Sequence, residues 1–324
     1  MNSFLFKLRF TAPVHFGLPD SALSLYSSGE TFCADTLFSA LCHTALSLWG
    51  PERLQKLCAQ VREGTLRLSD AMPWQDETFY LPKPMVEGKT ADRELPAAER
   101  KAMKKLRWLP VEAFDSFVCS LAGEQPFEAR RYAVEFGCAV ETTRARITEG
   151  EDTVPYAVGT FMFAPDCGLY ILAQCANESQ VDMLRTLLEA LGVSGIGGKV
   201  TSGCGRFVLE DEIDLGAPFD SQTEWFSRAL TGEHTRYLLV TASLPREEEL
   251  DETLTDASFG LIRRGGFVQS DTYAETARKK RTQYFLASGS VLARRFAGDL
   301  YEVGGSGAHP VYRYGCPILL GVNL

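Results

Sequence analysis

The sequence predicts an α+β fold built from antiparallel sheets, and three observations favour this class. Several short segments alternate apolar and polar residues, which is the pattern of strands in antiparallel sheets. Amphipathic helical patterns lie between runs of such strands, which is typical of α+β folds. The chain has 324 residues, and at roughly 100–200 residues per domain this length favours two domains.

The first strand is predicted at residues 3–11, with four apolar side chains on a buried face and Lys7 and Arg9 on the other. Asp35 is the expected N-cap of an amphipathic helix that stops before Gly50 and Pro51. Further elements are predicted in this order: a helix at 52–62 and strands near 65–69 and 78–81.

Residues 85–131 read as an insertion that carries one cationic helix near 97–107. After it the pattern predicts strands at 132–140, 142–148, 156–163 and 168–174, a helix at 178–191 capped by Gly192, and a strand from Arg206 to Ile213. A split β-α-β, ferredoxin-like unit is the simplest match, and we expect it to span residues 1–215. The second domain is expected at residues 216–324, with a mixed connection at 216–235 and strands at 236–243, 259–268, 282–287 and 311–322.

The composition excludes several classes of protein. No run of apolar residues approaches the roughly 18–20 that a membrane helix needs, and the N-terminus lacks the pattern of a signal peptide. Nine scattered cysteines without a C-x-x-C pair, and four histidines without ligand spacing, predict no metal site, no cofactor and a reducing, cytoplasmic location. The net charge of −9 opposes nucleic-acid binding on its own, but basic blocks are segregated from acidic ones and can form a local basic groove.

The most informative segment is a glycine-rich loop at residues 195–207, with five glycines in thirteen residues. Glycine permits positive φ and close backbone approach, and successive free amides can bind an anion. Charge comes from Lys199 and Arg206, and hydroxyl donors come from Thr201 and Ser202. The loop is not a nucleotide-binding P-loop, because Val200 follows the lysine and the loop enters a strand. A glycine-rich turn without a ligand is the plainer alternative.

This helix, loop and strand resemble the glycine-rich segment of the RAMP superfamily of CRISPR RNA-binding proteins. The start of the chain, residues 11–17 with 35–41, resembles the subunit that binds the 5′ end of the guide in type III-A (Csm) effector complexes. Residues 80–84, 263–267, 285–290 and 309–315 are similar to that family too, so the resemblance spans nearly the whole chain. Ala34 departs from the serine often found there, which puts a hydroxyl role at that position in doubt.

The resemblance implies two ferredoxin-like (RRM-like) domains and a subunit that is not an enzyme. It implies that the subunit holds the 5′ handle of the crRNA and contacts the large nuclease/cyclase subunit on one side and a backbone RAMP subunit on the other. No small-molecule substrate is expected. The segment 85–131 is where such subunits place a hairpin or thumb.

The residues predicted to contact RNA are a loop group and a set of outlying cations. His15, at the end of the first strand, either stacks on a base or is a turn histidine satisfied by backbone. The complete set is His15, Arg144, Gly197, Gly198, Lys199, Thr201, Ser202, Gly203, Gly205, Arg206, Arg263, Arg264, Lys279, Lys280 and Arg281.

Two other functions stay open at this stage. The first is a metal-independent endoribonuclease of the same superfamily that processes guide RNA, with His43 as general base. The second is an interaction module that contacts only protein partners.

Overall fold

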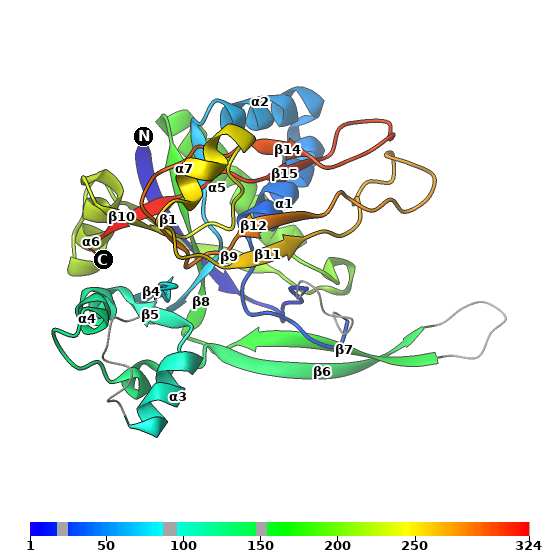
Figure 1. Cartoon of the computed structure of the whole chain (residues 1–324). Helices are drawn as coiled ribbons and strands as arrows, with labels where there is room; N and C mark the ends of the chain where they lie inside the picture. Colours follow the sequence, from blue (N-terminus) through cyan, green and yellow to red (C-terminus); the bar gives the residue numbers. More distant parts are fainter. Residues whose placement is uncertain (18–24, 87–95, 147–153, 324) are drawn as a thin grey trace.

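A computed structural model describes residues 1–17, 25–86, 96–146 and 154–323 of the chain. Its centre is an antiparallel sheet in the order β5-β4-β3-β8-β1-β9, with β2 also paired to β8 (Figure 1). The strands of this sheet are β1 (Asn2–Phe10), β2 (Leu66–Leu68), β3 (Met72–Gln75), β4 (Thr78–Pro82), β5 (Trp108–Pro110), β8 (Cys167–Cys175) and β9 (Phe207–Asp214).

Three helices cover one face of this sheet, namely α1 (Ala34–Trp49), α2 (Pro51–Arg62) and α5 (Glu178–Ser194). Their apolar side chains form one core with Phe4, Phe6 and Leu8 of β1. At roughly 1.5–3 kcal/mol for each fully buried large apolar side chain, this packing fixes the helices on the sheet.

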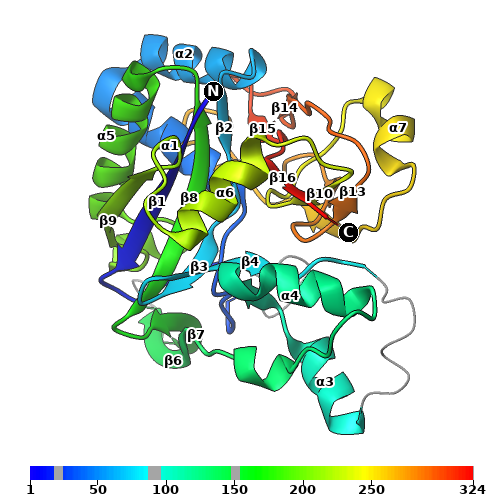
Figure 2. The same ribbon diagram turned by 90° about the vertical axis from the view of Figure 1, so that its left-hand side faces the viewer.

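The opposite face is also covered, so the sheet is a middle layer. Here α4 (Val111–Leu121) and α6 (Ser221–Thr231) pack with a second sheet in the order β13-β10-β16. The strands of that sheet are β10 (Arg236–Leu239), β13 (Val291–Leu292) and β16 (Leu319–Val322). Figure 2 shows β10, β13 and β16 gathered beside the large sheet, with α4 and α3 (Ala97–Lys105) together below them.

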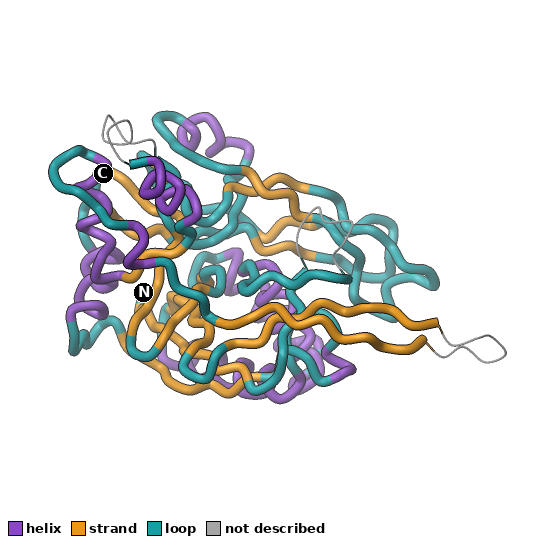
Figure 3. Tube along the Cα trace, turned by 90° about the horizontal axis from the view of Figure 1, so that it is seen from below, coloured by secondary structure: helices purple, strands orange, loops and turns teal. Residues whose placement is uncertain are grey.

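Three two-stranded ribbons complete the architecture. They are β6 (Gly137–Arg146) with β7 (Val154–Phe163), β11 (Leu261–Arg264) with β12 (Gln283–Leu286), and β14 (Leu300–Glu302) with β15 (Tyr312–Tyr314). The short helix α7 (Leu250–Leu254) precedes β11. Figure 3 shows β6 and β7 as a pair of long strands that run side by side away from the large sheet.

The α+β class with antiparallel sheets is confirmed, but several elements differ from the prediction. β1 is buried on both faces, because α6 and its neighbours cover the side that was expected to face solvent. Lys7 is therefore only 5% exposed, and its ammonium lies 4.3 Å from the centroid of the Trp74 ring. The two strands expected at 132–140 and 142–148 are one strand, β6, and residues 147 and 148 lie outside the described part of the chain.

Both predicted helix caps are wrong. Cys33 is the N-cap of α1, and the carboxylate of Asp35 pairs with arginines instead of capping the helix. α5 runs past Gly192 to Ser194, and its C-cap is Gly195, whose φ is 90°. Gly192 is needed for packing, because a Cβ there would lie 2.3 Å from the carbonyl oxygen of Phe207.

The segment 85–131 is more than a surface addition in its described part. It supplies β5, which pairs with β4 at the edge of the large sheet, and α4, which the sequence pattern missed. The ring of Phe114 in α4 packs edge-on against Trp225 of α6 at 5.2 Å, so α4 belongs to the core on that face. The cationic helix predicted near 97–107 is confirmed as α3.

Candidate nucleic-acid interface

The base of the glycine-rich loop is fixed by backbone hydrogen bonds to the segment that follows β1. The amide of Gly198 donates to the carbonyl of His15 at 2.8 Å, and that of Gly205 donates to Pro13 at 2.9 Å. Across the loop, the amide of Ile196 donates to Gly205 at 3.0 Å. The loop is therefore a preorganised structure, which lowers the entropy cost of binding a ligand.

Close packing explains two of its glycines. A Cβ at Gly205 would lie 2.0 Å from the carbonyl oxygen of Ile196, and one at Gly198 would lie 2.6 Å from Cδ2 of His15. Position 203 is different, because a Cβ there would meet only open space. Glycine is favoured there only by the positive φ of 85°. Lys199 also has a positive φ, 60°, which is uncommon outside glycine and points to a functional constraint.

The tip of the loop is accessible, but fewer of its amides are free than the sequence suggested. Seven amides of the loop donate to backbone carbonyls, namely those of Gly195, Ile196, Gly198, Ser202, Gly203, Cys204 and Gly205. Among the described residues, no acceptor pairs with the amides of Gly197, Lys199, Val200 and Thr201. The side chains of Thr201, Ser202 and Arg206 are exposed. The tip thus offers backbone, hydroxyl and guanidinium donors together.

His15 lies beneath this tip. It is only 8% exposed, and its Nδ1–H donates to the carbonyl of Gly159 in β7 at 2.6 Å. Its own carbonyl accepts from Gly198. His15 therefore connects the glycine-rich loop to the β6–β7 hairpin, as a turn histidine satisfied by backbone would.

Tyr156 brings two of the predicted cations together, although the sequence gave no reason to single it out. It pairs with Arg144 in the register of β6 and β7, and the ammonium of Lys199 lies 5.5 Å from its ring centroid. The Nε of Arg144 is buried and has no hydrogen-bond partner in the described part of the chain. The β6–β7 hairpin and the glycine-rich loop thus present their cations around one aromatic ring.

The remaining predicted cations lie in the C-terminal half, on β11 and the segment that leads from it to β12. Arg263, Lys279 and Arg281 are exposed, and Lys280 is half-buried. Figure 1 shows this segment, in orange, and the β14–β15 loop, in red-orange, extending in the same direction as the β6–β7 hairpin.

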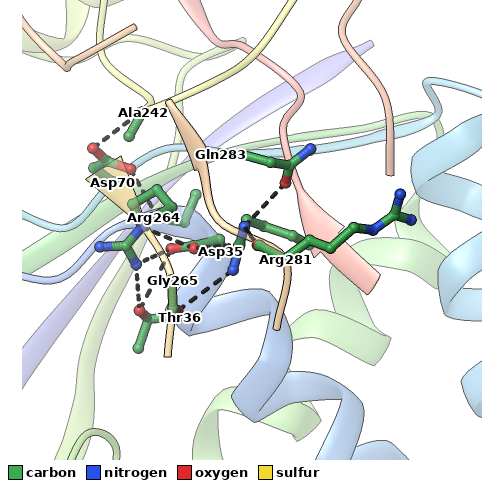
Figure 4. A network of polar contacts seen from close by, with 10 residues as sticks. Asp35, Thr36, Asp70, Ala242, Arg264, Gly265, Arg281 and Gln283 are labelled. Atoms are coloured by element: carbon green, nitrogen blue, oxygen red, sulfur yellow. Dashed lines mark hydrogen bonds and ion pairs between the residues drawn. The ribbon is translucent and has the colours of Figure 1, made fainter. Parts of the chain in front are cut away.

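Arg264 is engaged inside the protein. Its Nε donates to Asp35 at 2.9 Å, a second nitrogen bonds the other carboxylate oxygen, and Thr36 accepts at 3.2 Å. The side chains of Arg264 and Asp35 are 16% and 10% exposed, so this pair ties β11 to the start of α1 (Figure 4). The neighbouring anionic groups raise the pKa of Arg264 against the effect of burial.

A buried carboxyl, Asp70, completes this connection. Its two oxygens accept from the amides of Ala34 at 2.8 Å and Ala242 at 3.0 Å, so it joins the N-terminus of α1 to the segment after β10. Burial raises the pKa of Asp70 to about 7, although the two amide hydrogen bonds lower it. Figure 4 shows Asp70 next to the Asp35–Arg264 pair.

His43, the residue weighed as a general base, is exposed on α1. Partial burial lowers its pKa, and the charges of Lys280 and His309 lower it further. Among the described residues, no group of three or more His, Cys, Asp or Glu side chains could hold a metal ion, and none of their helices is long and apolar enough to cross a membrane.

Comparison with known proteins identifies the family of this chain. Residues 232–322 match the family model described as the CRISPR Csm4 C-terminal domain. A Mycobacterium tuberculosis (strain ATCC 25618 / H37Rv) protein named CRISPR system Cms protein Csm4 is 36% identical over 321 residues, covering 99% of this chain and 98% of its own. A Streptococcus thermophilus protein of the same name is 32% identical over 296 residues, which cover 89% of this chain and 88% of that protein.

Solved structures share the fold. The crystal structure of a Csm3-Csm4 subcomplex in the type III-A CRISPR-Cas interference complex matches with a TM-score of 0.66 and 17% identity over 100% of both chains. That of a Csm1-Csm4 cassette in complex with pppApA matches with a TM-score of 0.62 and 19% identity, over 100% of this chain and 99% of the other. The resemblance to the type III-A subunit is therefore confirmed. The chain belongs to the Csm4 family.

Proposed function

We propose that this chain is a non-catalytic RNA-binding subunit of a type III-A CRISPR effector complex, which holds the 5′ handle of the crRNA. In that assembly it would link the large nuclease/cyclase subunit to the backbone RAMP subunits, in the cytoplasm, without a cofactor. Structural relatives were solved in complexes with Csm1 and with Csm3, which supports both partner assignments.

The observation that carries the proposal is the tip of the glycine-rich loop. Four amides without an acceptor in the described part of the chain, two exposed hydroxyls and the cations Lys199 and Arg206 converge there. These groups suit a polyanionic strand, because backbone amides and cations bind phosphate oxygens whatever the base sequence. Arg144 adds a guanidinium from β6, and His15 positions the loop from below.

Two ferredoxin-like domains, at residues 1–215 and 216–324, form part of the proposal. Support for the first is the strand order β9-β1-β8-β3, with α1 after β1 and α5 after β8, which is the arrangement of a split β-α-β unit. Support for the second is the family match at 232–322 together with the separate sheet of β13, β10 and β16.

Reversal of charge in the loop tests the proposal. In the double variant Lys199→Glu with Arg206→Glu, guide binding should weaken, and the dependence of its logarithm on salt should become shallower by about 0.7 per lost phosphate contact. Filter binding with labelled crRNA over a salt series measures both quantities. The control variant Arg53→Glu with Lys56→Glu changes the same charge on exposed positions of α2 and should have a smaller effect. Equal effects from the two double variants would remove the loop from the proposal.

The endoribonuclease alternative has its own test. The purified chain is incubated with repeat RNA in EDTA, and the products are separated on a denaturing gel. We expect intact RNA. Site-specific cleavage that disappears in His43→Ala would instead establish a metal-independent nuclease.

A further inference from the structure

The outer face of the β11–β12 ribbon carries large side chains that lie in solvent. Side chains alternate along each strand, so in β11 Leu261 and Arg263 are exposed, whereas Arg264 is engaged inside the protein. In β12, Tyr284 is exposed and the next residue, Phe285, is fully buried. Leu261 and Tyr284 are each 59% exposed. Large apolar groups that stay exposed together on one face indicate a binding surface.

The pairing register places aromatic rings on this ribbon beside cations. Tyr284 stands opposite Arg263, and the Cβ atoms of directly opposed residues in an antiparallel pair lie about 4.5–5.5 Å apart on the same face. The ribbon continues through a bridge between Phe267 and Lys279, where the ammonium of Lys279 lies 5.9 Å from the ring centroid of Phe267. Phe267 is 47% exposed. Two pairs of an aromatic ring and a cation therefore follow one another along the ribbon.

The inner face of the ribbon is held by buried arginines. Arg313 is only 3% exposed, and it donates to the carbonyls of Arg281 at 2.9 Å and Gly265 at 3.4 Å. It also donates to the side-chain oxygen of Gln283 at 3.0 Å, and Arg264 ties the ribbon to the start of α1 (Figure 4). The backbone beneath the exposed rings is thus fixed, which lowers the entropy cost of binding a ligand there.

We propose that Tyr284 and Phe267 form a stacking platform for unpaired bases of single-stranded RNA, with Arg263 and Lys279 beside the adjoining phosphates. This inference rests on the proposed function, because it assumes that the chain binds a guide. It adds two aromatic residues that the sequence did not assign to RNA. It also adds contacts to bases, whereas the glycine-rich loop offers donors for phosphates alone.

The charges on the ribbon favour RNA over a protein partner. Between residues 261 and 286 the exposed side chains include four cations and two carboxylates, namely Arg263, Arg278, Lys279 and Arg281 with Asp271 and Glu275. The core of a protein–protein interface is depleted of charged side chains, lysine among them. Sites for single-stranded nucleic acid combine cations that follow the backbone with rings on which bases stack. An acidic protein segment would use the cations and leave the rings without a role.

Substitution of the two rings tests the platform within the full chain. The double variant Tyr284→Ala with Phe267→Ala is titrated with labelled single-stranded crRNA over a salt series. Each lost stacking contact should lower the affinity at least about fivefold. The dependence on salt should stay that of the wild-type protein, because stacking releases no counterions. Tyr284→Phe with Phe267→Tyr keeps both rings and should bind like the wild type. Phe219→Ala removes a ring that is 70% exposed outside the ribbon, just before α6, and should leave the affinity unchanged.

A guide without bases in its handle separates stacking from phosphate contacts. In this RNA every nucleotide of the 5′ handle is replaced by an abasic one, so that the phosphates remain. The wild-type chain should bind it more weakly than the intact guide, and the double Ala variant should bind it as well as the wild type does. A difference between the two proteins that persists on the abasic guide would show that the rings act other than by stacking, and it would overturn the inference.

The remaining outcomes separate this inference from the proposed function. If the glycine-loop double variant weakens binding and the ring variant does not, the platform is refuted and the proposed function stands. If neither variant changes RNA binding, both are refuted. Loss of assembly with protein partners at unchanged RNA affinity would identify the ribbon as a protein contact and overturn the inference. An equal loss of affinity in Phe219→Ala would overturn it as well.

Discussion

Removal of the Asp70 carboxyl should destabilise the protein in a way that depends on pH. In Asp70→Ala the buried amides of Ala34 and Ala242 lose their acceptor. An unsatisfied buried donor costs about 1–3 kcal/mol, so the expected loss in the free energy of unfolding is about 2–6 kcal/mol before charge is considered. The loss should also loosen the attachment of α1 to the segment after β10.

The ionisation of Asp70 makes the stability lost in Asp70→Ala depend on pH. The pKa of Asp70 is raised from 3.8 to about 7 on folding, so between these values the unfolded chain ionises the group while the folded chain keeps its proton. The stability of the wild-type protein therefore falls as pH rises through this window, whereas the variant has no such group. From about pH 5 to about pH 7, the cost of Asp70→Ala should decrease by about 2 kcal/mol.

Urea unfolding followed by tryptophan fluorescence at the two pH values measures this difference. The control is Glu189→Ala, which removes an exposed carboxylate from α5 and should change stability little at either pH. A cost of Asp70→Ala that stayed constant, or that increased toward neutral pH, would show that burial does not hold the proton on this carboxyl in the folded state.

Two further predictions concern other buried contacts. Gly205→Ala should abolish guide binding or folding, because its Cβ would lie 2.0 Å from the carbonyl oxygen of Ile196. In Gly203→Ala the Cβ would meet only open space, so the positive φ of 85° should lower the free energy of unfolding by no more than about 1–2 kcal/mol. Thermal unfolding of the two variants checks this order, and equal losses would contradict it. Lys7→Met should change stability by no more than about 1 kcal/mol. The polar contacts of its ammonium are long, 3.8 Å to the 95% exposed Glu77 and 3.4 Å to the carbonyl of Asp76, and an apolar side chain can still pack on Trp74. A loss of several kcal/mol in urea unfolding would show that the lysine charge is essential.

Local patterns predicted much of the first half of the fold. The positions of β1, α1, α2 and α5 follow from periodicity, because each buries an apolar stripe that repeats at its own period. The pattern failed where tertiary neighbours decide burial. From the sequence, Lys7 looks like a solvent-facing residue of a half-buried strand. In the structure that face is covered by α6 and the core around it, and α6 lies more than two hundred residues after Lys7 in the chain.

In the candidate interface too, some features could be predicted from the sequence and others could not. The glycine-rich loop could be found from sequence, since unusual backbone geometry requires glycine at several nearby positions. The roles of Asp35 and Arg264 could not, because their ion pair joins residues 229 positions apart. Tyr156 was missed for a similar reason: its importance comes from cross-strand pairing with Arg144 and from the approach of Lys199.

Asp35 offers a way to connect the stability of this protein with its proposed ligand. Asp35→Asn would leave Arg264 and Arg313 without their shared anion, and the removal of one partner from a buried ion pair costs about 3–5 kcal/mol. If a phosphate of the guide lies beside these two arginines, its charge would partly replace the missing carboxylate. Bound RNA should then raise the unfolding temperature of the variant by more than that of the wild-type protein, since a ligand stabilises the state that binds it. Thermal scans with and without crRNA at equal saturation measure the two shifts, and shifts of equal size would mean that the RNA phosphate lies too far from the arginines to replace the charge of Asp35.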